Sequence, residues 1–255
     1  MAPTAAFFDL DNTLLRGTSL IQLGRGLYER GFLTGRAMLR ALMMEARFRA
    51  TGSEHAEDAS EARDTALELI KGRDVAEFRA HCAAIFDDHI ADRFCPEAVA
   101  LANDHLESGH AVWLVTASPL EVAELCARHL GFTGGLGTVA ERVDGRYTGR
   151  LPVGLLHGPA KALAVQELAN VHGYDLTRAH AYSDSVNDLP MLSLVGHPTV
   201  VNPDVRLRQH AQTHGWPCVE FRDPSGVRRT VARGLRAGVT LGRAARGAVV
   251  AGLRR

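Results

Sequence analysis

Two aspartates separated by one residue follow an apolar run near the start of the chain. The run covers residues 5–10, and Asp9 and Asp11 stand at its end. Paired carboxylates suit a hard cation such as Mg²⁺, which prefers oxygen ligands. One carboxylate could attack phosphorus and form an acyl phosphate, while the other protonates a leaving group and then activates water. The alternative is a strand end with two solvated acids and a local turn.

A second motif, LVTAS at residues 114–118, begins within another apolar run at residues 111–115 and continues past its end. It carries the hydroxyl groups of Thr116 and Ser118. A hydroxyl and backbone N–H groups just after a buried strand can bind phosphate oxygens. The same residues could instead cap a helix that begins near Pro119.

Lys161 stands at the start of a predicted helix, residues 160–171. The protein uses arginine almost everywhere, and lysine occurs only at positions 71 and 161. A lysine kept at this place indicates a point charge, able to bind a phosphate and a carboxylate together, which a planar guanidinium would not replace. A solvated surface lysine is the alternative.

A third polar segment follows a short predicted strand at residues 179–182. Its sequence is SDSVND, and it contains Asp184, Ser185, Asn187 and Asp188. These side-chain oxygens could complete a magnesium shell, with waters filling the remainder. A turn rich in Asp, Asn and Ser is the alternative.

The elements that must position these residues alternate between strand and helix after residue 96. Strands are predicted at 5–10, 111–115, 179–182, 199–201 and 216–220, helices at 97–108, 120–130 and 160–171, and a hairpin within 137–150. This alternation predicts an α/β fold with a doubly wound, mainly parallel, Rossmann-like sheet. Ligands of such sheets bind beyond the carboxyl ends of the strands. Asp9, Asp11, Thr116 and Asp184 fall at those ends, which predicts a single site.

A long segment without proline interrupts this pattern. Helical spacing runs through residues 33–49 and 56–70, so we interpret residues 19–95 as a small inserted α-helical cap. The predicted domains are therefore an α/β core at 1–18 and 96–222, the cap at 19–95, and a C-terminal tail at 223–255.

Charge separates that tail from the rest of the chain. The formal net charge is +0, but residues 228–255 hold eight arginines and no acid, which leaves 21 basic against 29 acidic residues before them. The global charge does not favour a nucleic-acid partner. The basic tail could contact a membrane surface peripherally, or it could be a solubilising segment or pack on the core. The sequence shows no signal-peptide pattern and no apolar run long enough to span a membrane, and its four cysteines form no CxxC pair. These features predict a cytoplasmic protein.

The order of the motifs DLDNT, LVTAS, the Lys161 helix start and YSDSVNDLP resembles the haloacid dehalogenase superfamily of phosphohydrolases. The resemblance covers about residues 5–220. The hairpin DGRYTGRL and the segment VVNPDVRLRQHA are similar to the phosphoserine-phosphatase-like subgroup with a helical cap after the first motif. This resemblance implies a magnesium-dependent phosphatase that acts on a small phosphorylated alcohol or amino alcohol.

The resemblance also implies a role for each motif residue. Asp9 would be the nucleophile and Asp11 the general acid and base. Thr116, Ala117 and Lys161 would bind the phosphoryl group. Mg²⁺ would be held by Asp9, by Asp184 and by the backbone carbonyl of Asp11, and Asn187 and Asp188 would support the metal and the lysine.

The sequence departs from the subgroup at one place where substrate is read. Phosphoserine phosphatases usually carry a glutamate shortly after the first motif, and Thr18 stands there in this chain. This disfavours phosphoserine, unless Glu29 or Glu45 of the cap replaces that glutamate. A phosphotransferase or phosphomutase of the same fold, and a non-catalytic binding or regulatory member, are the alternatives. The sequence does not decide the oligomeric state.

Overall fold

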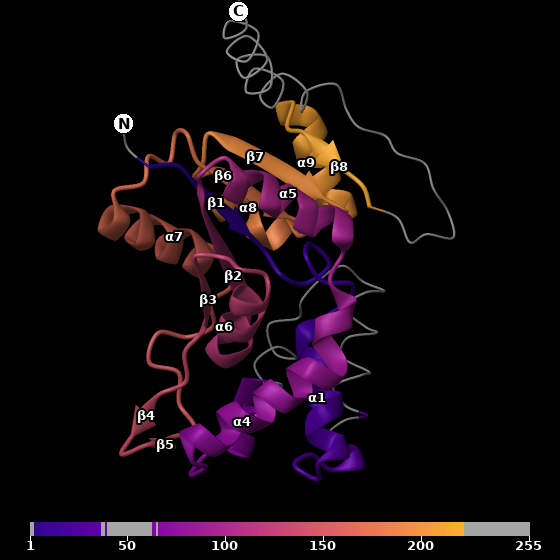
Figure 1. Ribbon diagram of the computed structural model, residues 1–255, viewed down its shortest axis with the longest axis vertical. Helices are drawn as coiled ribbons and strands as arrows, with labels where there is room; N and C mark the ends of the chain where they lie inside the picture. Colours follow the sequence, from indigo (N-terminus) through magenta and orange to yellow (C-terminus); the bar gives the residue numbers. More distant parts are fainter. Residues whose placement is uncertain (1–2, 37–38, 40–62, 65, 222–255) are drawn as a thin grey trace, which may run out of the picture.

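A six-stranded sheet forms the centre of the molecule (Figure 1). The computed structural model describes residues 3–36, 39, 63–64 and 66–221. The strand order is β3-β2-β1-β6-β7-β8, and each neighbouring pair is parallel. The strands are β1 (Ala5–Phe8), β2 (Ala111–Pro119), β3 (Gly134–Thr138), β6 (His180–Ser183), β7 (His197–Val201) and β8 (Cys218–Val219).

Helices cover both faces of this sheet. Ala6 and Phe8 of β1 belong to an apolar layer with residues of α5 and α6, whereas Ala5 and Phe7 belong to a second layer with α7, α8 and α9. These helices are α5 (Pro96–Glu107), α6 (Leu120–His129), α7 (Pro159–His172), α8 (Leu189–Leu192), preceded by the 3₁₀ turn η3 (Val186–Asp188), and α9 (Val205–His214). Burial on both faces explains why β1 is an apolar run without alternation. The predicted doubly wound, Rossmann-like fold is confirmed.

The ends of the first two strands differ from the prediction. β1 ends at Phe8, two residues before Leu10, because the chain turns there and the N–H groups of Leu14 and Leu15 both bond to the Leu10 carbonyl. β2 continues past Val115 to Pro119, with a shift in its register against β3.

A glycine-rich strand and a hairpin occupy the region predicted as hairpin alone. Gly137 and Thr138, at the beginning of the predicted window, complete β3. The hairpin itself is β4 (Arg142–Val143) paired antiparallel with β5 (Arg146–Tyr147). Asp144 and Gly145 have φ angles of 49° and 76°, as a type I′ turn requires. The predicted turn position is therefore confirmed, and the predicted start of the hairpin is wrong.

The described part of the predicted insertion is helical. It contains α1 (Ser19–Glu29), α4 (Val75–Ile85), the π-helical turn η1 (Phe86–Ile90) and the 3₁₀ turn η2 (Ala91–Arg93). Most of the helices predicted at 33–49 and 56–70, and the basic tail at 223–255, lie outside the described residues. The domain boundaries stay a prediction. Among the helices of the described ranges, none has the length and apolar character needed to cross a membrane.

The hairpin is bonded to the segment that leads into α4. The N–H of Gly72 donates to the Tyr147 carbonyl at 2.7 Å, and the N–H of Tyr147 donates to the Arg73 carbonyl at 3.1 Å. The N–H of Val75 donates to the Gly145 carbonyl at 2.9 Å. In Figure 1 the start of α4 accordingly lies beside β5, far below the sheet.

Candidate active site

The loop after β1 carries the two aspartates of the first motif. The backbone N–H of Asp9 donates to the Tyr182 carbonyl of the neighbouring strand at 2.9 Å, and Asp9 is only 6% exposed. The Asp11 carboxylate accepts a hydrogen bond of 2.7 Å from the N–H of Ser19, the first residue of α1. A helix N-terminus favours negative charge, so Asp11 is fixed at the junction between sheet and insertion. Asp9 is not a solvated strand end.

Lys161 lies in the first turn of α7 and is 3% exposed. Its Nζ is 2.5 Å from Asp9 Oδ1 and 2.7 Å from Asp188 Oδ2. Burial by itself lowers the pKa of Lys161, but the charges of the two carboxylates outweigh it and raise the pKa above the usual range. Lys161 is therefore a buried cation that joins the first motif to the last, and the alternative of a solvated surface lysine is wrong.

Asp188 is oriented by Ser183, a residue that is not among the predicted site residues. The hydroxyl of Ser183, the last residue of β6, donates to Asp188 Oδ2 at 2.7 Å. Ser185 caps the turn η3, where its Oγ accepts from the N–H of Asn187 at 3.2 Å. The turn and the site, which are alternative predictions for the segment SDSVND, are therefore both present. The turn places the Asp188 carboxylate against Lys161.

Asp184 stands beside the first motif. The hydroxyl of Thr13 donates to Asp184 Oδ1 over a long 3.5 Å. Burial, together with the charges of Asp9 and Asp188, raises the pKa of Asp184 well above its ordinary value of 3.8. Burial also raises the pKa of Asp9 to about 7, with Lys161 opposing the rise and Asp188 and Asp11 adding to it.

These residues fit a magnesium ion. The Lys161 ammonium contacts the carboxylates of Asp9 and Asp188, and the Asp11 and Asp184 carboxylates interact electrostatically with Asp9. Burial of this excess negative charge is unfavourable unless a cation balances it. The raised pKa values of Asp9 and Asp184 are the sign of this imbalance. The available donors are oxygens, which Mg²⁺ prefers. Asp9, Asp11 and Asp184 are the residues that would hold it.

The second motif lies at the end of β2, next to β1. Thr116 is 1% exposed, and its Oγ1 accepts from the N–H of Ser118 at 3.1 Å. The hydroxyls of Ser118 and Ser19 are 2.5 Å apart. α6 begins after Pro119 without a hydrogen bond from a capping side chain, so the alternative of a helix cap is wrong. The Ala117 carbonyl accepts from Thr138 Oγ1 at 2.7 Å, which fixes this end of β2 against β3.

The predicted substrate-reading residues lie in different places. Thr18 is half-buried and precedes α1, next to the contact between Ser19 and Asp11. Glu29 lies at the opposite end of α1, about 15 Å farther along the helix. Its two oxygens contact Arg25 Nε at 2.9 Å and His89 Nε2 at 2.8 Å. Glu29 is therefore directed to these ion pairs, whereas Glu45 lies outside the described residues.

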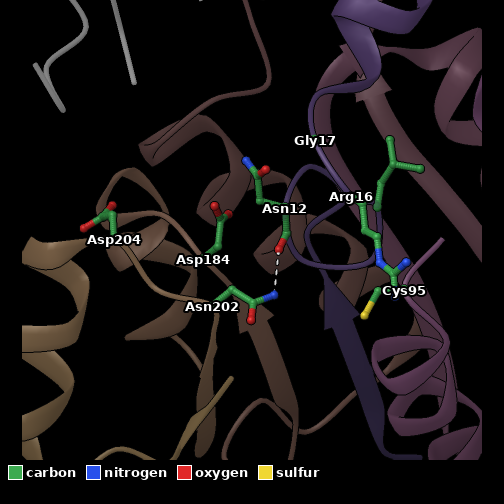
Figure 2. A pocket seen from close by; sticks show the side chains of 8 residues that line it. Asn12, Arg16, Gly17, Cys95, Asp184, Asn202 and Asp204 are labelled. Atoms are coloured by element: carbon green, nitrogen blue, oxygen red, sulfur yellow. Dashed lines mark hydrogen bonds between the residues drawn. The ribbon is translucent and has the colours of Figure 1, made fainter. Parts of the chain in front are cut away.

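A pocket of about 340 Å³ opens beside Asp184. Figure 2 shows the Asp184 and Asn12 side chains pointing the same way from two different loops, with Asn202 below them. Asn202 Nδ2 donates to the Asn12 carbonyl at 3.2 Å and so supports the turn that follows Asp11. The lining residues are Asn12, Leu15, Arg16, Gly17, Cys95, Asp184, Asn202 and Asp204.

Comparisons with known proteins agree with this architecture. The model of the haloacid dehalogenase-like hydrolase family matches residues 6–193. The chain is 48% identical over 248 residues to a protein of Mycobacterium tuberculosis (strain ATCC 25618 / H37Rv) named phosphoserine phosphatase SerB1, and the match covers 97% of this chain and 79% of that protein.

Solved structures share the fold. A Bordetella pertussis Tohama I protein of unknown function has a TM-score of 0.74 and 30% identity, covering 86% of this chain and 98% of that one. A substrate-bound phosphoserine phosphatase complex has a TM-score of 0.60 at 17% identity, covering 88% of this chain and 95% of that one. At that identity the second likeness concerns the fold alone.

Proposed function

The chain belongs to the haloacid dehalogenase-like hydrolase family, and from this premise we propose that it is a magnesium-dependent phosphomonoesterase. The observation that carries the proposal is the buried Lys161, which binds the carboxylates of the first and last motifs at 2.5 and 2.7 Å. Such a centre offers a carboxylate nucleophile and a fixed positive charge at one point, as phosphoryl transfer requires.

Asp9 is the nucleophile in this proposal. Because Lys161 holds its Oδ1, the carboxylate has a fixed orientation, and its second oxygen attacks phosphorus. The ester P–O bond breaks as the aspartyl–phosphate bond forms. The electron pair of the broken bond goes to the leaving alkoxide, which takes a proton from the carboxyl group of Asp11.

The second half of the reaction returns both aspartates to their starting states. Asp11, now a carboxylate, accepts a proton from water, and the water oxygen attacks the phosphorus of the aspartyl phosphate. Asp9 leaves as a carboxylate and inorganic phosphate is released. Bound at Asp9, Asp11 and Asp184, Mg²⁺ would supply positive charge for the phosphoryl oxygens. Lys161 and Thr116 would bind the same oxygens from the protein side.

A small phosphorylated alcohol or amino alcohol is the proposed substrate. The name of the 48% identical relative supports an amino alcohol such as phosphoserine. Thr18 stands where phosphoserine phosphatases usually carry a glutamate, which favours a substrate other than phosphoserine. A panel of esters decides between these.

The test is phosphate release from phosphoserine, histidinol phosphate, phosphocholine, glycerol phosphates and a lipid phosphate, each with Mg²⁺ and with chelator. We expect magnesium-dependent release from at least one ester. In Asp9→Asn the rate should fall roughly a thousandfold or more, because an amide is a far poorer nucleophile. Asp175→Asn is the matched control, since Asp175 is a surface carboxyl bonded to Thr177.

Three outcomes would contradict the proposal. Parental release by folded Asp9→Asn would show that another group attacks phosphorus. A stable phosphorylated protein that releases no phosphate without an added acceptor would identify a phosphotransferase. If magnesium-loaded protein neither releases phosphate nor becomes phosphorylated, a non-catalytic member of the family is favoured.

A further inference from the structure

Three histidines gather at the end of the sheet opposite the aspartates. His110 directly precedes β2, His180 begins β6, and His105 lies near the end of α5. Their potential ligand nitrogens all lie within 4.8 Å of one another. The roles described above for the phosphatase use none of these residues, and β1 separates the two ends by three residues, or about 10 Å, between Ala6 and Asp9.

The register of the sheet explains this gathering. His180 pairs with Ala6 of β1, and the N–H of Ala111, the residue after His110, donates to the Thr4 carbonyl. Because Ala5 pairs with Ala111, His110 lies opposite Thr4, just as His180 lies opposite Ala6. Thr4 and Ala6 are two residues apart on one strand and share a face, so His110 and His180 both project on the face covered by α5. Ala6 offers only a methyl group there, which leaves space for the imidazole rings.

His105 is brought to this space by the end of α5. The chain reverses at Gly109, with φ 77°, and the N–H of His110 donates to the His105 carbonyl at 3.0 Å. This turn places His105 Nδ1 and His110 Nδ1 2.9 Å apart. The His105 and His180 ring centroids are 4.5 Å apart.

We propose that His105, His110 and His180 form a binding site for a transition-metal ion of the zinc type. Zinc takes imidazole nitrogens at about 2.0–2.1 Å in a tetrahedral arrangement, which sets neighbouring nitrogens about 3.3 Å apart. The nitrogen–nitrogen distances in this cluster run from 2.9 Å to at most 4.8 Å, a range that includes this value. Neutral imidazoles without a carboxylate select zinc-type ions over magnesium.

The outer contacts of the cluster fit metal binding. His105 Nε2 lies 2.8 Å from the Tyr182 hydroxyl, so His105 can donate its Nε2–H there and direct the Nδ1 lone pair into the cluster. Metal-binding histidines commonly have such a partner for their second nitrogen. Burial, followed by the neighbouring histidines, lowers the pKa of His105 to about 3 and that of His180 to about 4.

One proton must move when the metal binds. Without metal, one proton lies between the two Nδ1 atoms, which are 2.9 Å apart; when His105 carries its proton on Nε2, His110 Nδ1–H is the donor and His105 Nδ1 the acceptor. When the metal binds, His110 takes the tautomer with its proton on Nε2, and both Nδ1 lone pairs become ligands. Water fills the fourth position. The ion would join α5 to β2 and β6 and so stabilise this end of the sheet.

The test uses untagged full-length protein, because a polyhistidine tag would itself bind zinc. Metal is removed with chelator, Mg²⁺ is added in excess to fill the carboxylate site, and Zn²⁺ binding is measured by calorimetry. We expect one tightly bound Zn²⁺ and a higher unfolding temperature with zinc. Magnesium-dependent phosphate release by His110→Gln should equal that of the parent.

Four variants make the assignment specific. His110→Gln and His180→Gln, both at half-buried residues, should lose the bound zinc. Tyr182→Phe removes only the hydroxyl partner of His105 and should weaken zinc binding roughly 10–100-fold. His214→Gln is the control, because His210 and His214 stack at 3.9 Å on α9 and form the competing histidine pair. It should bind zinc as the parent does.

The proposal is overturned if the parent binds no zinc in the presence of magnesium. It is also overturned if folded His110→Gln and His180→Gln bind zinc like the parent, or if His214→Gln alone abolishes binding. None of these results depends on phosphatase activity.

Discussion

Lys161 is enclosed by the carboxylates of Asp9 and Asp188, and the three charges depend on one another. A buried ion pair contributes little net stability when complete, but removal of one partner leaves an uncompensated charge. The two lysines of the sequence therefore have opposite environments. Lys71 is exposed and pairs with Glu68 at 3.2 Å.

We predict that Lys161→Met lowers the free energy of unfolding by about 3–5 kcal/mol at pH 8 without divalent cations. Lys71→Met, the matched control, should lower it by less than about 1 kcal/mol. The loss in Lys161→Met should shrink at pH 6, because Asp9, whose pKa is about 7, then takes up a proton. Urea denaturation of the three proteins measures this, and equal losses for the two lysine variants would contradict it.

The sequence predicts the charged residues of the site and misses two neutral residues that support them. Asp9, Lys161 and Asp188 were selected by motif order, and the structure brings them together. Ser183 and Asn202 were not selected, since serine and asparagine are common in turns and give no local signal. Their importance arises from distant partners: Asn202 binds the Asn12 carbonyl 190 residues away.

β3 shows why one element was missed. The strand reads GGLGT, and glycine disfavours strands by propensity, so the pattern does not indicate a strand there. The structure gives the reason for the glycines. A Cβ on Gly135 would meet the Ala123 carbonyl oxygen at 2.6 Å, and one on Gly137 would meet Leu120 Cα at 2.7 Å. Close approach of α6 to the sheet therefore requires glycine.

We predict that Gly135→Ala lowers the free energy of unfolding by about 1–3 kcal/mol, because the obstacle is helix backbone. Gly134→Ala is the matched control. A Cβ there would meet the edge of the Trp113 ring at 2.5 Å, and a side chain can rotate away. Denaturation midpoints compare the two variants. A greater loss of unfolding free energy in Gly134→Ala would show that the α6 backbone shifts more easily than the Trp113 side chain.

At the scale of the whole molecule, the sheet has carboxylates at one end and histidines at the other. The first group could be predicted because each member follows a strand in a recognisable motif. The second could not, because His105, His110 and His180 come from a helix, a loop and a strand, and only the strand register brings them together. No spacing in the sequence indicates that register.

Magnesium should stabilise the whole fold, and more so at higher pH. The cation competes with a proton on Asp9, whose pKa is about 7. Affinity should therefore fall as pH drops from 8 to 6, by up to about tenfold for each pH unit below 7. The measurement is the rise in unfolding temperature caused by Mg²⁺ at each pH, relative to chelator.

Two variants check the origin of this effect. Asp184→Asn should lose the magnesium-induced rise, whereas Asp175→Asn should keep it. An equal rise at pH 6 and pH 8 in the parent would show that no proton is displaced from Asp9.

The hydrogen bonds between the hairpin and the entry to α4 have a consequence for protein engineering. Gly72, Arg73 and Val75 bond to backbone groups of β5 and its turn, although the bonded residues are at least 70 positions apart in the sequence. In a chimera that exchanges the predicted insertion alone, the replacement segment would itself have to supply the partners of these backbone groups. We therefore expect that the hairpin at residues 142–147 has to be transplanted together with the predicted insertion, so that the exchanged module would consist of two discontinuous pieces of chain.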